Sequence, residues 1–450
     1  MTDDLTRWVS SRVTIPAALS EDLFDEPGRA GLIGLLVGTL KQVVDVARVP
    51  PEGFETRPLL ARFLDLLSAQ WQAMVEELAL RLAADTPELV GRLNSGKDLG
   101  RVVGIRGETG DRHRQGRQVL VLDFDSGATL VYKPRDVGPD AVFGDFLHWL
   151  SQNASLPEYR TPTLLRRSGY GWAEFIEARP PATPADERAF WQRTGGLLAV
   201  LDLLNARDCH WQNVIAAGEY PVLVDAEGLF HRALFDADET TEDVEETRAL
   251  SVLSTGMTPY WKRSGDTRNE VSGGGAPPPE RIDSVLAGFE VTCRALMDRR
   301  STLLEPDGPL ASFKEVQVRT IFRDTAVYQE RMLDSLRPEC LARDDVHESA
   351  LALPETDVRD ARMADVERAE LAALRRFDVP RFTARAGGTA IDLDGRESPA
   401  WFRKTGLELV HERIRDLDER AIARKLDYLR AAYALAALED SFRRRRSSTT

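Results

Sequence analysis

The spacing of apolar residues predicts a helical region at the start of the chain. Residues 28–47 form a nearly continuous apolar segment, which Pro50 and Pro51 should terminate. A longer amphipathic helix is expected over residues 57–84, because apolar side chains recur there every three or four positions. These positions are Leu60, Phe63, Leu64, Leu67, Trp71, Met74 and Leu78. We interpret them as core residues and assign them no chemistry.

The pattern changes from helical to strand-like near residue 94. A hairpin is expected whose turn lies at residues 125–127 and whose second strand presents Lys133. The expected segments are strands over 118–124, 128–132, 161–167 and 171–177 and a short amphipathic helix over 141–152. This region should therefore form a sheet with one helix.

Pro180, Pro181 and Pro184 break the pattern and predict a hinge. Beyond it the chain is mainly helical, with one hairpin formed by strands over 214–217 and 222–224. Helices are expected over residues 187–204, 280–300, 360–376 and 405–442. The predicted fold class is α+β with two lobes, divided into an N-terminal helical region (1–95), a strand-rich N-lobe (96–179) and a helical C-lobe (180–450).

Composition and charge narrow the classes of partner. The 450 residues carry 59 Lys and Arg against 73 Asp and Glu, a net charge of −14. An acidic protein of this kind is a poor candidate for nucleic-acid or anionic-membrane binding. We find no signal peptide and no apolar run long enough to span a bilayer. The expected location is cytoplasmic, with no nucleic-acid and no membrane partner.

The cysteines indicate neither a disulfide framework nor a structural zinc site. The chain has three of them, Cys209, Cys293 and Cys340, and no two are close in sequence. An acidic run over 236–246 predicts an exposed segment, and a glycine- and proline-rich stretch over 272–279 predicts a loop.

A glycine-rich loop precedes Lys133. Residues 104–117 contain four glycines together with five arginine and histidine side chains. Backbone N–H groups of such a loop can contact phosphates, and a lysine at the end of the next hairpin is where kinase-like folds hold nucleotide phosphates. The alternative is a surface loop, which its composition alone favours.

The strongest chemical signal is the polar loop over residues 208–213 and the hairpin after it. Asp208, His210 and Asn213 lie in this loop, and the hairpin delivers Asp225 and then Glu227 at its end. Phosphoryl transfer needs a carboxylate for the attacking hydroxyl and amide and carboxylate oxygens for magnesium. A polar loop on an ordinary hairpin is the alternative, and the D-x-H-x-x-N pattern alone would favour it.

A second polar segment lies further along the chain. Arg319 and Arg323 alternate with apolar residues before a helix expected to begin near Thr325. Two arginines and a threonine at a helix N-terminus would hold an anion such as a phosphoryl group. A capping threonine beside surface arginines is the alternative, and it is favoured when the segment is considered alone.

Six short segments, taken in order along the chain, resemble the motifs of one known family. They are the segments 110–117, 130–135, 170–175, 208–213, 220–227 and 318–325. The chain is similar over residues 57–440 to the dehydratase domain of class II lanthipeptide synthetases. The resemblance implies a fold like that of phosphoinositide lipid kinases. It also implies an enzyme that phosphorylates Ser and Thr of a precursor peptide with ATP and then eliminates phosphate.

The resemblance also implies roles by position. In the phosphorylation step, Lys133 would hold nucleotide phosphates, Asp208 would orient the substrate hydroxyl, and His210 would support the loop and the phosphoryl oxygens. The magnesium ligands would be Asn213, Asp225 and Glu227, and the backbone near Glu174 to Glu177 would contact adenine. Asp111 and His113 match the family's D-x-H pair in the phosphate-facing loop, and Arg319 and Thr325 match its elimination pair. The cofactors would be ATP and Mg²⁺.

The family's full-length enzymes continue into a zinc-containing cyclase, for which this sequence has no Cys and His cluster. We therefore expect a stand-alone dehydratase that acts on a precursor peptide with a leader and works beside a separate cyclase. A shorter N-terminal segment than usual leaves leader recognition open. The alternatives are a peptide kinase without elimination and a non-catalytic, kinase-like peptide-binding subunit.

Overall fold

The computed structural model describes most of the chain. The described parts are Leu5, Trp8, Val9 and residues 13–49, 57–107, 111–232, 251–259, 277–354 and 361–447, the last nine as backbone only. The predicted acidic segment over 236–246 and residues 272–276 of the predicted loop lie outside these residues.

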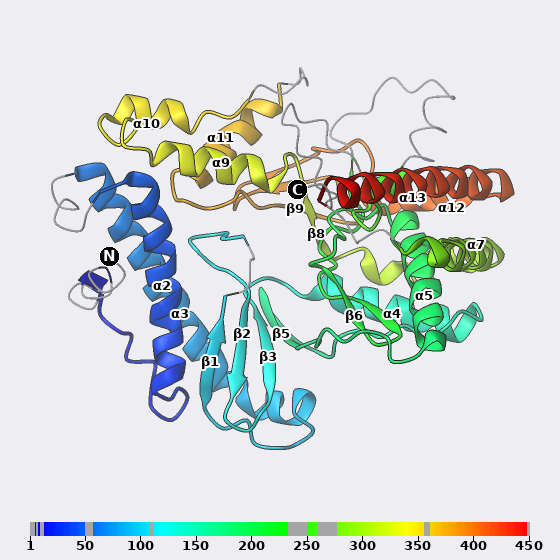
Figure 1. Ribbon diagram of the computed structural model, residues 1–450, viewed down its shortest axis with the longest axis horizontal. Helices are drawn as coiled ribbons and strands as arrows, with labels where there is room; N and C mark the ends of the chain where they lie inside the picture. Colours follow the sequence, from blue (N-terminus) through cyan, green and yellow to red (C-terminus); the bar gives the residue numbers. More distant parts are fainter. Residues whose placement is uncertain are drawn as a thin grey trace.

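Two long helices form one side of the molecule (Figure 1). Helix α2 (Glu26–Ala47) begins where the Asp25 side chain accepts a hydrogen bond from the Gly28 N–H, and it ends at Arg48 in a left-handed conformation. Helix α3 (Pro58–Leu93) extends to residue 93, beyond the end at residue 84 that the amphipathic pattern predicted. The apolar positions predicted for it are all buried, which confirms that they belong to the core.

Helix α2 corrects one expectation. By length and composition it could cross a membrane, whereas we expected no such segment. Core helices of globular proteins meet the same test. In this structure Leu32, Leu36 and Leu40 of α2 are at most 1% exposed and belong to the same core cluster as α3.

The predicted strands form a five-stranded antiparallel sheet beside these helices. It comprises β1 (Val102–Arg106), β2 (Leu120–Phe124), β3 (Thr129–Lys133), β4 (Leu164–Arg167) and β5 (Tyr170–Glu174) in the order β1-β2-β3-β5-β4. Strand β1 was not predicted. Helix α4 (Gly138–Asn153) follows β3 after only four residues, which brings its first turn close to Lys133.

Helices dominate the opposite side of the molecule, with the β6–β7 hairpin between them and the sheet (Figure 1). The hairpin strands are β6 (Val214–Ala217) and β7 (Tyr220–Leu223), joined by a turn at Gly218. The helices are α5 (Pro184–Leu203), α7 (Ile282–Asp298), α8 (Arg300–Leu303), α12 (Gly406–Arg415) and α13 (Glu419–Ser447). Short 3₁₀ turns occupy Ser251–Ser254, Pro279–Arg281 and Ala311–Phe313.

The region after residue 180 also contains a second sheet, so it is less purely helical than predicted. Its strands, in the order β11-β10-β9-β8, are β8 (Gln317–Thr320), β9 (Phe382–Arg385), β10 (Ile391–Leu393) and β11 (Glu397–Ser398). Between β8 and β9 the chain forms α9 (Thr325–Ser335), α10 (Asp344–Ala350) and α11 (Met363–Leu374). Strands this short carry little periodic signal, which is why the sequence did not reveal the sheet.

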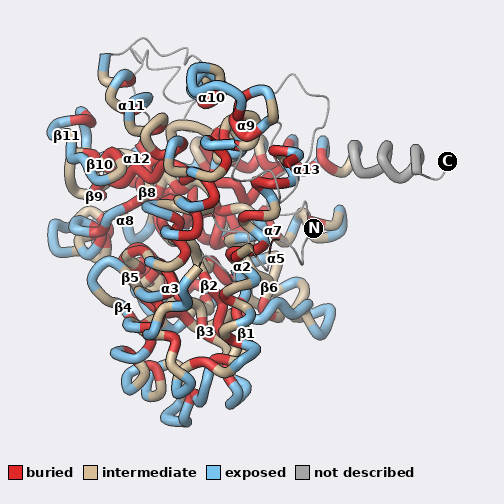
Figure 2. The backbone as a smooth tube through the Cα atoms, turned by 90° about the vertical axis from the view of Figure 1, so that its left-hand side faces the viewer, coloured by how far each residue is buried: buried red, intermediate tan, exposed pale blue. Residues whose placement is uncertain are grey.

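Two large core clusters organise the interior. One joins α2, α3 and the first sheet to residues of α9 and to residues 374–379, and the other joins α4 to α5, α7, α12 and α13. Strands of the first sheet run through buried interior, and exposed residues lie around the periphery (Figure 2). The fold is mixed α+β, as predicted. The lipid-kinase-like arrangement and the boundaries at 95/96 and 179/180 stay predictions.

Candidate functional site

Strand β3 ends at Lys133, and its ammonium group lies where the first sheet meets the β6–β7 hairpin. The Lys133 Nζ atom donates to Asp140 Oδ1 at 2.9 Å and to the backbone carbonyl of Val224. Asp140 stands in the first turn of α4, directly after the strand. A buried lysine that pairs with a carboxylate of the following helix is the arrangement with which kinases position a phosphate-binding lysine.

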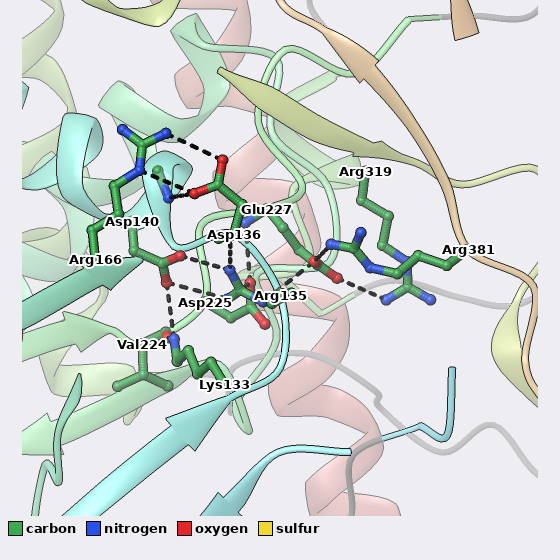
Figure 3. A network of polar contacts seen from close by, with 11 residues as sticks. Lys133, Arg135, Asp136, Asp140, Arg166, Val224, Asp225, Glu227, Arg319 and Arg381 are labelled. Atoms are coloured by element: carbon green, nitrogen blue, oxygen red, sulfur yellow. Dashed lines mark hydrogen bonds and ion pairs between the residues drawn. The ribbon is translucent and has the colours of Figure 1, made fainter. Parts of the chain in front are cut away.

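Arg135 lies two residues after Lys133 and connects it to the end of the hairpin. Its Nη1 atom lies 2.7 Å from Asp140 Oδ2, its Nη2 atom 2.8 Å from Asp225 Oδ1 and its Nε atom 3.4 Å from Glu227 Oε2 (Figure 3). Charge-assisted contacts of a planar guanidinium fix the direction of all three carboxylates. Arg135 therefore ties the sheet to the predicted metal residues.

Glu227 is the next link in this network and is surrounded by arginines. Besides Arg135, it contacts Arg319 through Oε1, at 3.2 Å from Nη1, and Arg381 through Oε2. The Arg319 N–H also donates to the Glu227 carbonyl at 2.7 Å, so backbone and side chain hold the same pair together. The network thus runs without interruption from Lys133 to the second sheet.

The loop over residues 208–213 is held in a defined conformation. Asp208 has a φ of 64°, and the Asn213 side chain donates to its carbonyl at 2.7 Å. The Gln212 N–H donates to His210 Nδ1 at 3.2 Å, and Nε2 lies 3.4 Å from Asp208 Oδ1. The imidazole therefore directs its ring N–H at the Asp208 carboxylate.

Gly228 and Gly256 allow the chain to pack closely around this loop. A Cβ atom on Gly228 would lie 2.2 Å from the Arg207 carbonyl oxygen, and one on Gly256 would lie 2.9 Å from the Cys209 nitrogen. Neither neighbour is a flexible side chain, so a larger residue at these positions would displace the backbone beside Asp208.

Asp111 brings the glycine-rich loop to the start of α9. Its Oδ2 accepts a hydrogen bond from Thr325 Oγ1 at 3.0 Å, and its Oδ1 accepts one from Gln329 at 3.1 Å. Arg319 lies between two carboxylates, 3.8 Å from Asp111 Oδ2 and 3.8 Å from Asp208 Oδ2. The residues matched to elimination thus adjoin the loop matched to phosphorylation.

A segment that we did not associate with the site completes this side. The Val379 carbonyl accepts a hydrogen bond from His113 Nδ1 at 2.7 Å, and the carboxylate of Asp378 accepts from the Gln115 and Gly116 N–H groups. These contacts fasten the loop after Asp111 to residues 378–379 and bring Arg381 beside it. Residues more than 260 positions apart in sequence therefore share one site.

The carboxylates of the site differ in whether their pKa is raised or lowered. Burial raises the pKa of Asp225, with added repulsion from Glu227, and Arg135 does not fully offset these effects. Burial would also raise the pKa of Glu227, but Arg381, Arg135 and Arg319 outweigh it and hold that pKa well below its usual range. Burial would raise the pKa of Asp140 as well, but the charges of Arg135 and Lys133 outweigh this effect and lower that pKa to about 2.

In the glycine-rich loop, burial is the main cause of the pKa shifts. It raises the pKa of Asp111, against the opposing effect of Arg319. It lowers the pKa of His113 to about 3, with a further contribution from Arg319, so the imidazole is neutral at physiological pH.

Asn213 and Asp225 are the predicted ligands that could hold a magnesium ion shared with a nucleotide. Among the described residues no three His, Cys, Asp or Glu side chains form a metal cluster. Magnesium bound with nucleotide needs only one or two protein ligands beside the phosphates. The Val224 N–H donates to the Asn213 carbonyl at 2.8 Å, which keeps Asn213 close to Asp225. A cation there would relieve the unfavourable burial of the Asp225 charge.

Two predicted residues, Glu174 and Glu177, lie outside this network. Glu174 accepts from Arg160 at 2.6 Å and from the Thr163 N–H at 3.1 Å, and Glu177 lies on the surface, 3.5 Å from Arg179. The adenine contact near them stays a prediction.

Arg323 contacts Glu370 at 3.0 Å and the Pro354 carbonyl at 2.8 Å. Arg319 and Arg323 therefore do not form the expected pair. Nor does Thr325 cap its helix, because the side chain of Asp324 takes that role.

Sequence reasoning missed Arg135, Asp140 and Arg381. The first two had a detectable signal, since both follow Lys133 closely and a kinase-like lysine requires an acidic partner. Arg381 had none, because only the pairing of β8 with β9 brings it to Arg319.

Comparison with known proteins gives one similar protein and one matching family. The chain is 26% identical, over an alignment of 228 residues, to the "Lacticin 481/lactococcin biosynthesis protein LcnDR2" of Lactococcus lactis subsp. lactis. The alignment covers 48% of this chain and 22% of the length of the relative. The model of a family described as a domain of unknown function, DUF4135, matches residues 58–282 and 268–385, well over half of the chain. The chain therefore belongs to the DUF4135 family.

Proposed function

We propose that this chain dehydrates Ser and Thr residues of a ribosomally made precursor peptide, by phosphorylating the hydroxyl with ATP and then eliminating phosphate. The observation that carries the proposal is the uninterrupted polar network from Lys133 through Arg135 and Glu227 to Arg319 (Figure 3). It joins the residues matched to both half-reactions. The similarity to a lacticin 481 biosynthesis protein adds support for a role in lanthipeptide maturation.

In the phosphorylation step, Lys133 binds nucleotide phosphates and Asp208 orients the peptide hydroxyl and accepts its proton. His210 directs its Nε2 side at Asp208 and so holds that carboxylate in place. Asn213 and Asp225 would hold the magnesium ion, which when bound neutralises charge on the phosphates. The hydroxyl oxygen forms a bond to the γ-phosphorus as the bond to the ADP oxygen breaks.

In the elimination step, a base removes the Cα proton and those electrons form the Cα–Cβ double bond. The Cβ–O bond then breaks and phosphate leaves with its electron pair. Arg319 stabilises this charge from its position between Asp111 and Asp208. Thr325 and Gln329 hold the Asp111 carboxylate in the same region.

The remaining features belong to the same proposal. The nucleotide lies between two lobes arranged as in lipid kinases, the substrate is a precursor peptide with a leader, and a separate cyclase acts on the dehydrated product in the cytoplasm. These expectations follow from the resemblance of the motifs.

Incubation with ATP, Mg²⁺ and the cognate peptide, followed by intact-mass measurement, tests the proposal. We expect loss of one water per modified residue. An Arg319→Ala variant should accumulate phosphopeptide, because its phosphate is formed but not expelled. Phosphate that persists with the unaltered protein would indicate a kinase without elimination. Absence of both ATP binding and any mass change would indicate a non-catalytic peptide-binding subunit.

A further inference from the structure

Glu227 was matched to a magnesium ligand, but its surroundings are those of an arginine anchor. Arg319 occupies Oε1, and Arg381 and Arg135 occupy Oε2. Three guanidinium groups around one carboxylate would repel a divalent cation approaching the same oxygens. Asp225 differs, because among the cations of the described chain only Arg135 forms an ion pair with it.

Arg319 lies in β8 and Arg381 directly precedes β9, and both contact the carboxylate of Glu227. Strand β8 pairs with β9 so that Arg319 opposes Thr383, two residues after Arg381. The side chains are 11% and 10% exposed. Figure 3 shows both guanidinium groups on the same side of Glu227, directed toward its carboxylate.

Two guanidinium groups converge on the Glu227 carboxylate, and Arg319 also faces the carboxylates of Asp111 and Asp208. Burial, together with the charges of both arginines, keeps the imidazole of His113 in the glycine-rich loop neutral, so it adds no charge here. Paired arginines presenting planar donors are the usual protein site for a phosphate dianion. The corner also adjoins Asp208, where the phosphorylated hydroxyl would be formed.

We propose that Arg381 is a second phosphate-binding residue, which grips the phosphoryl group of the peptide together with Arg319, and that Glu227 positions both arginines instead of ligating magnesium. This inference rests on the proposed function and deepens it. Arg381 contacts the leaving group, whereas Glu227 acts through the arginines and is a positioning residue. The magnesium site is then reduced to Asn213 and Asp225.

The first test measures phosphate binding directly. Inorganic phosphate is titrated into the metal-free protein by calorimetry, for the unaltered chain and for Arg319→Met, Arg381→Met and Arg385→Met. We expect each of the first two variants to weaken binding about tenfold or more, because each loses a charge-assisted contact. Arg385 is the matched control, an exposed arginine at the end of β9 that pairs with Glu315, and its loss should change affinity less than twofold. Normal phosphate binding by Arg381→Met, or no binding by the unaltered chain, would overturn the assignment.

A Lys133→Met variant separates this site from the nucleotide site. Its phosphate affinity should stay within about threefold of the unaltered chain, because Lys133 lies at the opposite end of the network. Loss of phosphate binding in this variant would place the anion at the nucleotide site and contradict the role given to Arg381.

The second test concerns the metal. Mn²⁺ binding in the presence of a non-hydrolysable ATP analogue is followed by electron paramagnetic resonance for Glu227→Gln and Asp225→Asn. We expect less than threefold weakening for Glu227→Gln and at least tenfold weakening for Asp225→Asn; equal losses would refute the positioning role of Glu227. If the unaltered chain binds phosphate but neither the analogue nor Mn²⁺ and dehydrates no peptide, the proposed function fails while the phosphate result stands.

Discussion

Two buried carboxylates, Asp202 and Asp225, show how differently this fold treats charge. Asp202, in α5, contacts Lys425, the Arg413 Nη2 atom at 2.8 Å and the Ser251 hydroxyl at 2.7 Å. Burial would raise its pKa, but Lys425 and Arg413 reverse this and lower it. Its charge is satisfied by the protein alone.

Asp225 forms an ion pair with Arg135, against two such pairs for Asp202, and it has more competing carboxylates nearby. Burial raises its pKa, Glu227 and Asp140 add repulsion, and Arg135 and Lys133 only partly compensate. Burial of a charge alone therefore does not indicate a functional site, because the ion cluster of Asp202 is equally buried. A buried carboxylate that the fold leaves short of positive charge is the better candidate for a functional residue.

The largest expected effect is on activity, in an Asp225→Asn variant. Peptide phosphorylation should fall by about a thousandfold, the size of a lost preorganised electrostatic contact in an active site. Stability should stay the same or rise, because a neutral amide replaces a carboxylate whose charge is unfavourably buried. Intact-mass kinetics and urea denaturation measure the two quantities. An Asp225→Asn variant that is less stable than the unaltered chain but still active would contradict the contrast between Asp225 and Asp202.

The opposite pattern is expected for Asp202→Asn. Removing the shared carboxylate leaves Lys425 and Arg413 buried without their partner, which should lower the free energy of unfolding by about 3–5 kcal/mol. The matched control is Asp427→Asn, since Asp427 lies on the surface beside Arg430 and should change stability by less than about 0.5 kcal/mol. An Asp202→Asn variant as stable as this control would show that the cluster is not structural.

The pH dependence of stability should depend on Asp140. Its pKa is lowered to about 2 in the folded chain, so its ionised form stabilises the fold above the unfolded pKa of about 3.9. That contribution, about 2–3 kcal/mol at neutral pH, is lost as pH falls from about 4 toward 2. An Asp140→Asn variant should lose this part of the pH dependence in urea unfolding. Identical pH profiles for variant and unaltered chain would contradict the buried pairing with Arg135.

The smallest effect is expected for the Thr325 hydroxyl, which donates to Asp111. A Thr325→Val variant should slow elimination about tenfold, the cost of one lost hydrogen bond of about 1.4 kcal/mol to a charged group. Phosphorylation should be unchanged, so phosphopeptide accumulates and is detected by intact mass. Thr325→Ser keeps the hydroxyl and should restore the rate. Failure of serine to restore it would mean that the methyl group, not the hydroxyl, matters.

The local parts of the fold were accessible from the sequence. A long apolar segment predicted α2, an amphipathic period predicted α3, and strand-like segments on either side of a turn predicted the β2–β3 and β6–β7 hairpins. Each depends on neighbours a few residues apart, which a sequence records directly. The second sheet was missed because its strands span two to four residues and pair across a long insertion.

The candidate site was accessible only in part, for the same reason. Lys133, Asp208 and Asp225 stand in motifs, but Arg381 reaches Glu227 across 154 positions with no motif of its own. The pairing of Arg323 with Glu370 was equally invisible, because only tertiary packing decides which of two similar arginines faces the site.

Titration of Mg²⁺–ATP into the chain by calorimetry tests whether Lys133 and Asp225 line one nucleotide site. We predict saturable binding by the unaltered protein and at least tenfold weaker binding by Lys133→Met and by Asp225→Asn, since the proposal places these residues on two sides of the nucleotide phosphates. Absence of binding, or equal affinity in all three proteins, would show that no such site exists.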